Sequence, residues 1–202
     1  MEVTTMTSFN IILFDDFETL DAFGPVEVIG KLSNIYRLRY HSLNGGLIKN
    51  SQQVSVDTLP FTEIESSGIL LIPGGIGTRS LVNDSNFIEQ LKILSERAPY
   101  VLTVCTGSAL LAKTNLLNGM RATSNKMAFE WVRSIGTEVN WVEKARWVKD
   151  GKFYTSSGVS AGIDMTLGYV SDIHEIKTSQ AIADGIEYVW NSNMDDDPFA
   201  KK

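Results

Sequence analysis

The chain has 202 residues, of which 43% are hydrophobic and 21% are charged. These values suit one large globular domain, so we predict a single domain over residues 1–202 with an ordered core over about residues 8–192. Eighteen basic and 24 acidic side chains give a net charge of −6. This charge disfavours a surface that binds nucleic acid.

The numbers of cysteines and histidines, and the lengths of the apolar runs, exclude further classes of protein. Cys105 is the only cysteine, which excludes an intramolecular disulfide and favours the cytoplasm. His41 and His174 are the only histidines, too few for a typical metal site, so we expect no metal. The start of the sequence lacks a basic segment, and no apolar run approaches the roughly 20 residues of a membrane helix. We therefore expect neither a secretory signal nor a membrane span.

The first half of the chain alternates strand patterns and helix patterns. In chain order these patterns predict a strand over 9–14, a helix over 19–32, a strand over 36–42, a turn at Gly45-Gly46 before another short strand, a strand over 68–72, a helix over 87–97 capped by Asp84 or Ser85, a strand over 100–104 and a helix over 106–113. Pro25 falls in the first of these helices, so it must lie in the first turn or at a kink.

The second half has a looser pattern. It predicts a strand over 121–124, a helix over 127–135, two strands within 138–149 that carry Trp141 and Trp147, a strand over 153–157, helices over 161–173 and 176–190, and a frayed or loosely docked tail over 193–202. Strands that alternate with helices through short connections predict an α/β fold, in which a mainly parallel sheet has helices on both faces.

Three loops follow strands of this predicted sheet, at the edge where parallel α/β sheets bind ligands. They are residues 15–21 (DDFETLD), 73–78 (PGGIGT) and 105–107 (CTG). Cys105 lies at a sharp turn between a buried strand and a helix, where free N–H groups and the helix dipole favour a thiolate. We therefore interpret Cys105 as a nucleophile rather than as a residue that only fills the core.

A carboxylic acid is the candidate partner of this thiol. Neither histidine lies on a segment aimed at Cys105, so we assign both a surface or packing role and expect no Cys-His pair. Asp15, Asp16 and Glu18 are expected to cap and charge the N-terminus of the helix that follows them. Asp21 is expected to point inward. A nearby thiolate would raise the pKa of Asp21 and keep it protonated at neutral pH, so that it can donate a proton to a substrate.

The glycine-rich loop after the second buried strand has two interpretations. Backbone N–H groups at Gly74, Gly75 and Ile76 could form an oxyanion hole, because glycine lets a ligand approach the backbone closely. A plain turn explains the same residues nearly as well. As a dinucleotide-binding signature the loop is weak, because Ser80 stands where a third glycine would be needed.

Several segments resemble the ThiJ/PfpI superfamily, which is related to the class I glutamine amidotransferases. In order they are LDAFGPVEVI, IPGGIGT, VCTGSALLAKTNLLNG, RATSNKMAFEWV, NWVEKARWVKDGKFYTSSGVSAGIDM and IADGIEYVW, which span almost the whole chain. The resemblance implies a flavodoxin-like α/β sandwich and a homodimer. LD followed two residues later by GP, with CTG in place of CHG, is similar to the isonitrile hydratase branch. Members of that branch add water to an isonitrile and form an N-substituted formamide.

This resemblance also implies roles for individual residues. Cys105 would be the nucleophile, Asp21 the acid that handles the proton and activates water, and Thr106 a supporting hydroxyl, with a small electrophile as substrate and no cofactor. One departure is the stretch 123–126 (TSNK), where the hydratases carry Thr-Thr-His-Trp, so the substrate could be another small electrophile.

Two alternatives remain open at this point. One is a cysteine-based redox or ligand sensor, although a chain of 202 residues leaves no room for the helix-turn-helix domain that some related regulators carry. The other is a glyoxalase-like activity on small aldehydes. Members with that activity pair the cysteine with a glutamate and a histidine, which this sequence does not have at the matching places.

Overall fold

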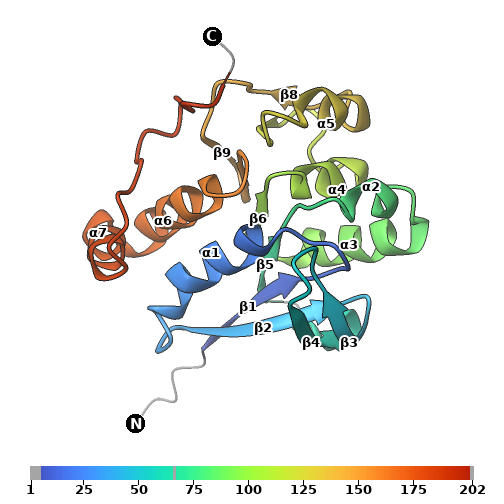
Figure 1. The fold of residues 1–202 in the computed structure, drawn as a ribbon, viewed down its shortest axis with the longest axis horizontal. Helices are drawn as coiled ribbons and strands as arrows, with labels where there is room; N and C mark the ends of the chain where they lie inside the picture. Colours follow the sequence, from blue (N-terminus) through green and yellow to red (C-terminus); the bar gives the residue numbers. More distant parts are fainter. Residues whose placement is uncertain (1–5, 66, 201–202) are drawn as a thin grey trace.

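The computed structural model describes residues 6–65 and 67–200 and contains one eight-stranded sheet with helices on both faces (Figure 1). In spatial order the strands are β3 (Asn44–Lys49), β4 (Ser55–Pro60), β2 (Tyr36–Ser42), β1 (Thr7–Ile12), β5 (Ile69–Ile72), β6 (Val101–Val104), β10 (Phe153–Ser156) and β9 (Trp147–Asp150). The edge strands β3 and β9 are antiparallel to their neighbours, and the six strands between them are parallel. The predicted flavodoxin-like α/β fold is confirmed.

The helices form two layers. One face of the sheet is covered by α1 (Thr19–Gly30), α6 (Ala161–His174) and α7 (Ile176–Gly185), and the other by α3 (Ser85–Arg97) and α4 (Gly107–Lys113), with α2 (Thr78–Leu81) and α5 (Phe129–Ile135) next to α4. A short 3-10 helix, η1 (Phe61–Glu63), precedes β5. The strands β7 (Arg121–Ala122) and β8 (Asn140–Trp141) form a separate two-stranded sheet. Within the described residues, no helix is long and apolar enough to cross a membrane.

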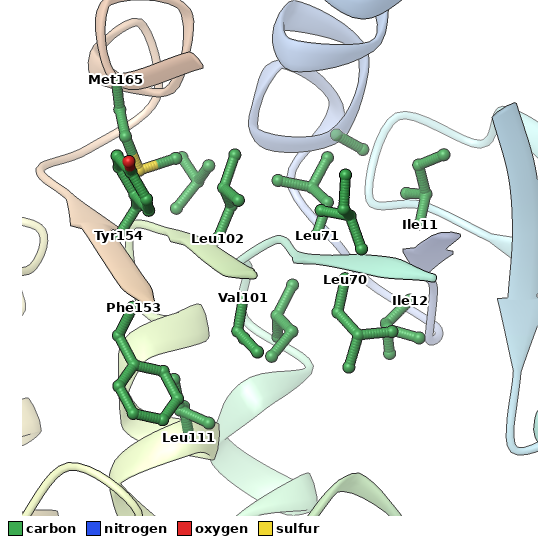
Figure 2. Packing of buried hydrophobic residues seen from close by; sticks show 14 of the residues in the cluster. Ile11, Ile12, Leu70, Leu71, Val101, Leu102, Leu111, Phe153, Tyr154 and Met165 are labelled. Atoms are coloured by element: carbon green, nitrogen blue, oxygen red, sulfur yellow. The ribbon is translucent and has the colours of Figure 1, made fainter. Parts of the chain in front are cut away.

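The central strands are apolar on both faces, because helices cover both sides of the sheet. Successive strand residues point to opposite faces, and Figure 2 shows the result: Ile11, Leu71, Leu102 and Tyr154 lie on the side of Met165 from α6, and Ile12, Leu70, Val101 and Phe153 lie on the side of Leu111 from α4. All of these side chains are buried. Burial on both faces fixes the positions of the strand ends, and with them the loops that follow.

Two sequence signals within helices, a capping residue and a proline, can be compared with the structure. The Asp84 side chain caps α3 by accepting a hydrogen bond from the Phe87 N–H over 3.0 Å. Pro25 lies inside α1, beyond its first turn, and is buried. Of the two predicted places for Pro25, the first turn is excluded, and a kink within the helix remains the prediction.

Two predicted boundaries also differ from the structure. Gly45 and Gly46 lie inside β3, with φ angles of 73° and 87°, and not in a turn before a strand. The last helix ends at Gly185 and does not continue to Trp190, because Glu187 has a φ of 53° that is incompatible with a right-handed helix. The strand β4, which lies between β3 and β2, has no counterpart among the predicted elements.

The C-terminal tail was expected to be frayed or loosely docked, which is wrong for its described part, residues 193–200. The Asp197 N–H donates to the Lys144 carbonyl over 2.7 Å, and the Met194 carbonyl accepts from the Arg146 N–H over 2.7 Å. The Asp197 side chain is buried and lies 3.5 Å from the guanidinium of Arg146, which also pairs with Asp164 at 2.8 Å. A buried guanidinium needs such anionic partners, which explains why an acidic tail packs here.

Candidate active site

The turn from β6 to α4 holds Cys105 in an unusual backbone conformation. Its φ is 56°, a region that residues other than glycine seldom occupy. The Cys105 N–H donates to the Ser157 carbonyl over 3.1 Å, and the Cys105 carbonyl accepts from Ser108 Oγ at 3.0 Å and Ser124 Oγ at 2.8 Å. Strain of this kind costs roughly 1–3 kcal/mol and is common at functional sites. Three neighbouring segments therefore stabilise the bend that carries the thiol.

The glycine of the CTG motif lets this turn approach the end of β5. A Cβ atom at Gly107 would lie 2.3 Å from the Ile72 carbonyl oxygen, closer than any side chain can approach. A residue with a side chain at this position would push α4 away from the sheet. The third position of the motif is therefore fixed by backbone packing.

Cys105 lines a small cavity at the carboxyl ends of the parallel strands. Only 7% of the residue is exposed, but it borders a cavity of about 180 Å³. The other lining residues are Glu18, Gly75, Ile76, Arg79, Thr106, Asn125, Ala128 and Val159. The volume is below the roughly 300–1,000 Å³ of typical small-molecule pockets. A small ligand therefore fits this site, and Cys105 borders the space that it would occupy.

Asp21 lies in the first turn of α1 and is fully buried. Its Oδ2 accepts a hydrogen bond from the Gly74 N–H over 2.9 Å, whereas Oδ1 has no hydrogen-bond partner within the described chain. Burial raises the pKa of Asp21 to about 7, and the negative charge of Glu18 adds to this, although the bond from Gly74 opposes it. The carboxyl group therefore holds its proton below about pH 7 and is half-protonated near that pH.

Cys105 and Asp21 affect each other's ionisation. Burial raises the pKa of the Cys105 thiol, and a charged Asp21 raises it further. Hydrogen bonds to the sulfur from Thr106 and from the Asn125 side chain lower it. The pair can hold one negative charge far more easily than two, because the charges repel in a buried site. The stabilisation expected from the helix N-terminus is thus outweighed by burial, which raises the pKa of the thiol.

Thr106 ties the Cys105 turn to the glycine-rich loop. Its Oγ1 accepts from the Gly75 N–H over 3.1 Å and lies 3.3 Å from the Gly75 carbonyl. The N–H groups of Gly74 and Gly75, which one of the two interpretations assigned to an oxyanion hole, donate to Asp21 and Thr106. A Cβ at Gly74 would lie 2.6 Å from the Thr106 nitrogen. The absence of a side chain at Gly74 therefore lets this loop pack against the Cys105 turn of the same protein. Ile76, the third residue of the predicted set, lines the cavity.

Asn125 is a site residue that sequence reasoning noted only as a departure from the hydratases. Its Oδ1 accepts from the N–H groups of Met127 at 2.9 Å and Ala128 at 3.0 Å. These two bonds fix the orientation of the amide, so its NH₂ group is the part that donates to the Cys105 sulfur. The sequence signal was an asparagine shortly before a helix, which indicates a local turn but not a long-range contact.

Two further lining residues, Arg79 and Val159, carried no signal in the sequence. Val159 has a φ of 48°, which is a strained conformation for a β-branched residue. Strained residues therefore border the cavity from two sides, at Cys105 and at Val159.

Other candidate groups lie away from the cavity or act differently from expectation. His41 is buried in β2, with Nδ1 3.3 Å from the Pro60 carbonyl, and His174 lies 2.6 Å from the Tyr36 hydroxyl. Glu18 precedes α1 but its side chain makes no capping hydrogen bond, and Asp15 Oδ1 accepts from the Lys49 N–H over 2.9 Å. The expected capping by these two acids is wrong. In residues 6–65 and 67–200, no three His, Cys, Asp or Glu side chains form a group able to hold a metal ion.

Comparison with known proteins places this fold and site in a family. The profile of the DJ-1/PfpI family matches residues 8–172. The chain belongs to the DJ-1/PfpI family. The fold agrees, since a ThiJ/PfpI family protein from Pseudomonas syringae superposes with a TM-score of 0.84 at 23% identity, covering 97% of this chain and 78% of that chain.

Relatives within the DJ-1/PfpI family differ in activity. The isonitrile hydratase of Pseudomonas putida is 29% identical over 180 residues, which cover 88% of this chain and 76% of that enzyme. The HTH-type transcriptional regulator CdhR of Pseudomonas aeruginosa is 26% identical over 157 residues, which cover 77% of this chain and 46% of the regulator. Because the family includes an enzyme and a regulator, its membership alone does not decide the activity of this chain.

Proposed function

We propose that this DJ-1/PfpI protein hydrates a small isonitrile to an N-substituted formamide, with Cys105 as nucleophile and Asp21 as acid and base. The observation that carries the proposal is the pairing of a cavity-lining thiol with a buried carboxyl whose pKa is raised to about 7. Similarity to the Pseudomonas putida isonitrile hydratase supports this class of reaction. The reaction requires no cofactor, because both the nucleophile and the proton donor come from the chain.

The first step joins the substrate to the enzyme. With one proton shared by the pair, the reactive form has a thiolate at Cys105 and a protonated Asp21. The sulfur attacks the terminal isonitrile carbon, and Asp21 gives its proton to that carbon. One C–S and one C–H bond form, and the product is a thioimidate with a carboxylate beside it.

The second step releases the formamide. The Asp21 carboxylate accepts a proton from water as the water oxygen attacks the thioimidate carbon. Proton transfer from the new hydroxyl to nitrogen, followed by cleavage of the C–S bond, gives the formamide and restores the thiolate and the protonated acid. Thr106 positions the turn, and we assign the Ile76 amide, from the predicted oxyanion set, as the donor that faces the developing charge.

Turnover of a simple alkyl isonitrile tests this function. We expect formamide production by the wild type, none by Cys105→Ala, and a loss of about 10²-fold or more with Asp21→Asn. Circular dichroism of each variant checks that the fold is kept. Wild-type turnover by Asp21→Asn would remove Asp21 from the mechanism.

The alternative activities make different predictions in the same assay. A redox or ligand sensor would turn over no isonitrile, and a glyoxalase-like enzyme would consume methylglyoxal instead. Measuring both substrates with one preparation separates the three. The homodimer implied by the resemblance is tested by light scattering of the purified chain.

A further inference from the structure

Arg79 brings a positive charge to the wall of the Cys105 cavity. It lies in α2, and its guanidinium stacks on the indole of Trp131 in α5, with Cζ 3.3 Å from the ring centroid. Stacking holds the plane of a guanidinium in place and leaves its N–H edge available for hydrogen bonds. Arg79 is therefore a fixed cation beside the thiol.

One part of this guanidinium lacks a partner. Its Nη1 atom is buried and has no acceptor within hydrogen-bond distance anywhere in residues 6–65 and 67–200. A buried donor without an acceptor is costly, and more so when it is charged. Because Arg79 lines the cavity, the unsatisfied hydrogen-bonding capacity of its guanidinium lies at the cavity wall.

The chemistry of the donor indicates the ligand. A guanidinium edge matches the two oxygens of a carboxylate, which it binds with two parallel hydrogen bonds. The net charge of −6 means that Arg79 is not part of a generally basic surface. Glu18 lines the same cavity and repels anions, so a bound carboxylate must lie nearer to Arg79 than to Glu18.

We propose that Arg79, held by Trp131, binds a carboxylate on the substrate, so that this site prefers a small carboxylate-bearing electrophile to its neutral analogue. This proposal rests on the proposed function for the identity of the electrophile. The recognition of the carboxylate itself can be tested without any isonitrile turnover.

Alkylation of Cys105 provides that test, since it is the only cysteine of the chain and intact mass reports its modification without ambiguity. Iodoacetate and iodoacetamide react with the same thiolate, but only iodoacetate carries a carboxylate. The ratio of their rate constants cancels the ionisation of the thiol. Dividing by the same ratio for N-acetylcysteine amide removes the intrinsic difference between the two reagents.

We expect this normalised ratio to be about ten in the wild type, because a charge-assisted hydrogen bond contributes about this factor. In Arg79→Gln the ratio should fall to about one. Glu18→Gln should raise it. Arg133→Gln is the matched control, because Arg133 lies on α5, is exposed and pairs with Glu130 at 3.4 Å. Arg79→Lys keeps the positive charge but lacks the planar edge of the guanidinium, so it should give an intermediate ratio. If Arg79→Gln does not fold, Arg79→Lys replaces it in this test.

A wild-type ratio near one, or a ratio that Arg79→Gln leaves unchanged, would overturn the proposal. Turnover of isocyanoacetate and of its methyl ester then separates the two proposals. If neither compound reacts while the alkylation ratio depends on Arg79, the isonitrile function fails and the carboxylate site stands. If both compounds react equally well and the ratio is one, the carboxylate site fails and the hydratase function stands.

Discussion

Asp21 accepts a hydrogen bond from the backbone N–H of Gly74 over 2.9 Å, and this bond joins the first turn of α1 to the loop that follows β5. It fixes one carboxyl oxygen and leaves Oδ1 without a partner among the described residues. The acid is thereby oriented but can still hold a proton. Its position depends on two segments that are distant in the sequence.

Burial of Asp21 should make the stability of the protein depend on pH. Its pKa rises from 3.8 to about 7 on folding, so between about pH 4 and pH 7 the folded state binds more protons than the unfolded state. Stability is therefore lost as the pH rises through this window, with an upper limit of about 4 kcal/mol. Asn at this position stays neutral, so Asp21→Asn should lose less stability than the wild type between pH 4 and pH 8. Urea unfolding of both proteins at pH 4 and at pH 8 measures this difference in the free energy of unfolding.

The matched control for this experiment is Asp16→Asn, which alters an exposed carboxyl in the loop before α1. We expect the control to show the same pH dependence as the wild type. An identical pH dependence in Asp21→Asn and the wild type would mean that the pKa of Asp21 is not raised.

The reactivity of Cys105 should report the first ionisation of the pair. Below about pH 7 both groups are protonated, and above it the pair carries one negative charge, which resides mainly on Asp21 because burial raises the pKa of the thiol. The small fraction of this charge on sulfur rises with the ionisation of the pair and then stays constant. The rate of alkylation by iodoacetamide should therefore rise through about pH 7 and then level off. In Asp21→Asn this step should disappear, because only the thiol can ionise. A pH–rate profile with the same step in both proteins would contradict the coupling.

The Thr106 hydroxyl should matter as a hydrogen-bond acceptor. Thr106→Val removes Oγ1 and leaves the Gly75 N–H without its acceptor at 3.1 Å, which should cost roughly 1–3 kcal/mol. Thr106→Ser keeps the oxygen and should lie close to the wild type. Urea unfolding measures the stabilities, and equal losses in both variants would assign the effect to packing of the methyl group instead.

The order of strands and helices could be predicted because the central strands are buried on both faces and read as continuous apolar runs. Ile69–Ile72 and Val101–Val104 are examples, with every residue buried. The strand β4 (Ser55–Pro60), next to the edge strand β3, has only one buried residue, so its sequence carries no such run. The parallel arrangement then brings the loops with Asp21 and Cys105 to one edge of the sheet. For this reason the sequence alone could predict that these two residues form a pair.

Other features of the site depend on contacts that the sequence does not encode locally. Asn125 donates to Cys105 only because the segment after β7 folds over the β6–α4 turn, and Arg79 meets Trp131 only through the packing of α2 near α5. The direction of the thiol pKa was wrong for a related reason. The dipole of α4 can be inferred from the helix pattern, but the degree of burial of Cys105 cannot.

Asn125 should lower the pKa of Cys105 through its NH₂ group. Asn125→Asp keeps an oxygen for the Met127 and Ala128 N–H groups, but it replaces a donor to the sulfur with a negative charge. The pKa of Cys105 should rise by about one unit, so alkylation at a fixed pH should slow about tenfold. Asn44→Asp adds the same charge at an exposed position on β3 and should leave the rate unchanged. Equal rates in both variants would mean that Asn125 does not contact the sulfur.

The C-terminal tail should contribute to stability through Asp197. This carboxylate lies 3.5 Å from Arg146 and 3.8 Å from Lys126, whose side chains are almost fully buried. Asp197→Ala removes this carboxylate from two buried cations, Arg146 and Lys126. Arg146 keeps Asp164 as an anionic partner at 2.8 Å. Removing one partner of a buried ion pair should cost roughly 3 kcal/mol in the free energy of unfolding, measured in urea.

Asp196→Ala tests whether this loss comes from the ion pairs or from the tail in general, because Asp196 is exposed and adjacent in sequence. We expect that control to stay within about 0.5 kcal/mol of the wild type. The loss in Asp197→Ala should also shrink in an Arg146→Met background, because the cation that needs Asp197 is then absent. A loss that is the same in both backgrounds would show that Asp197 stabilises the tail through its backbone contacts and not by neutralising Arg146.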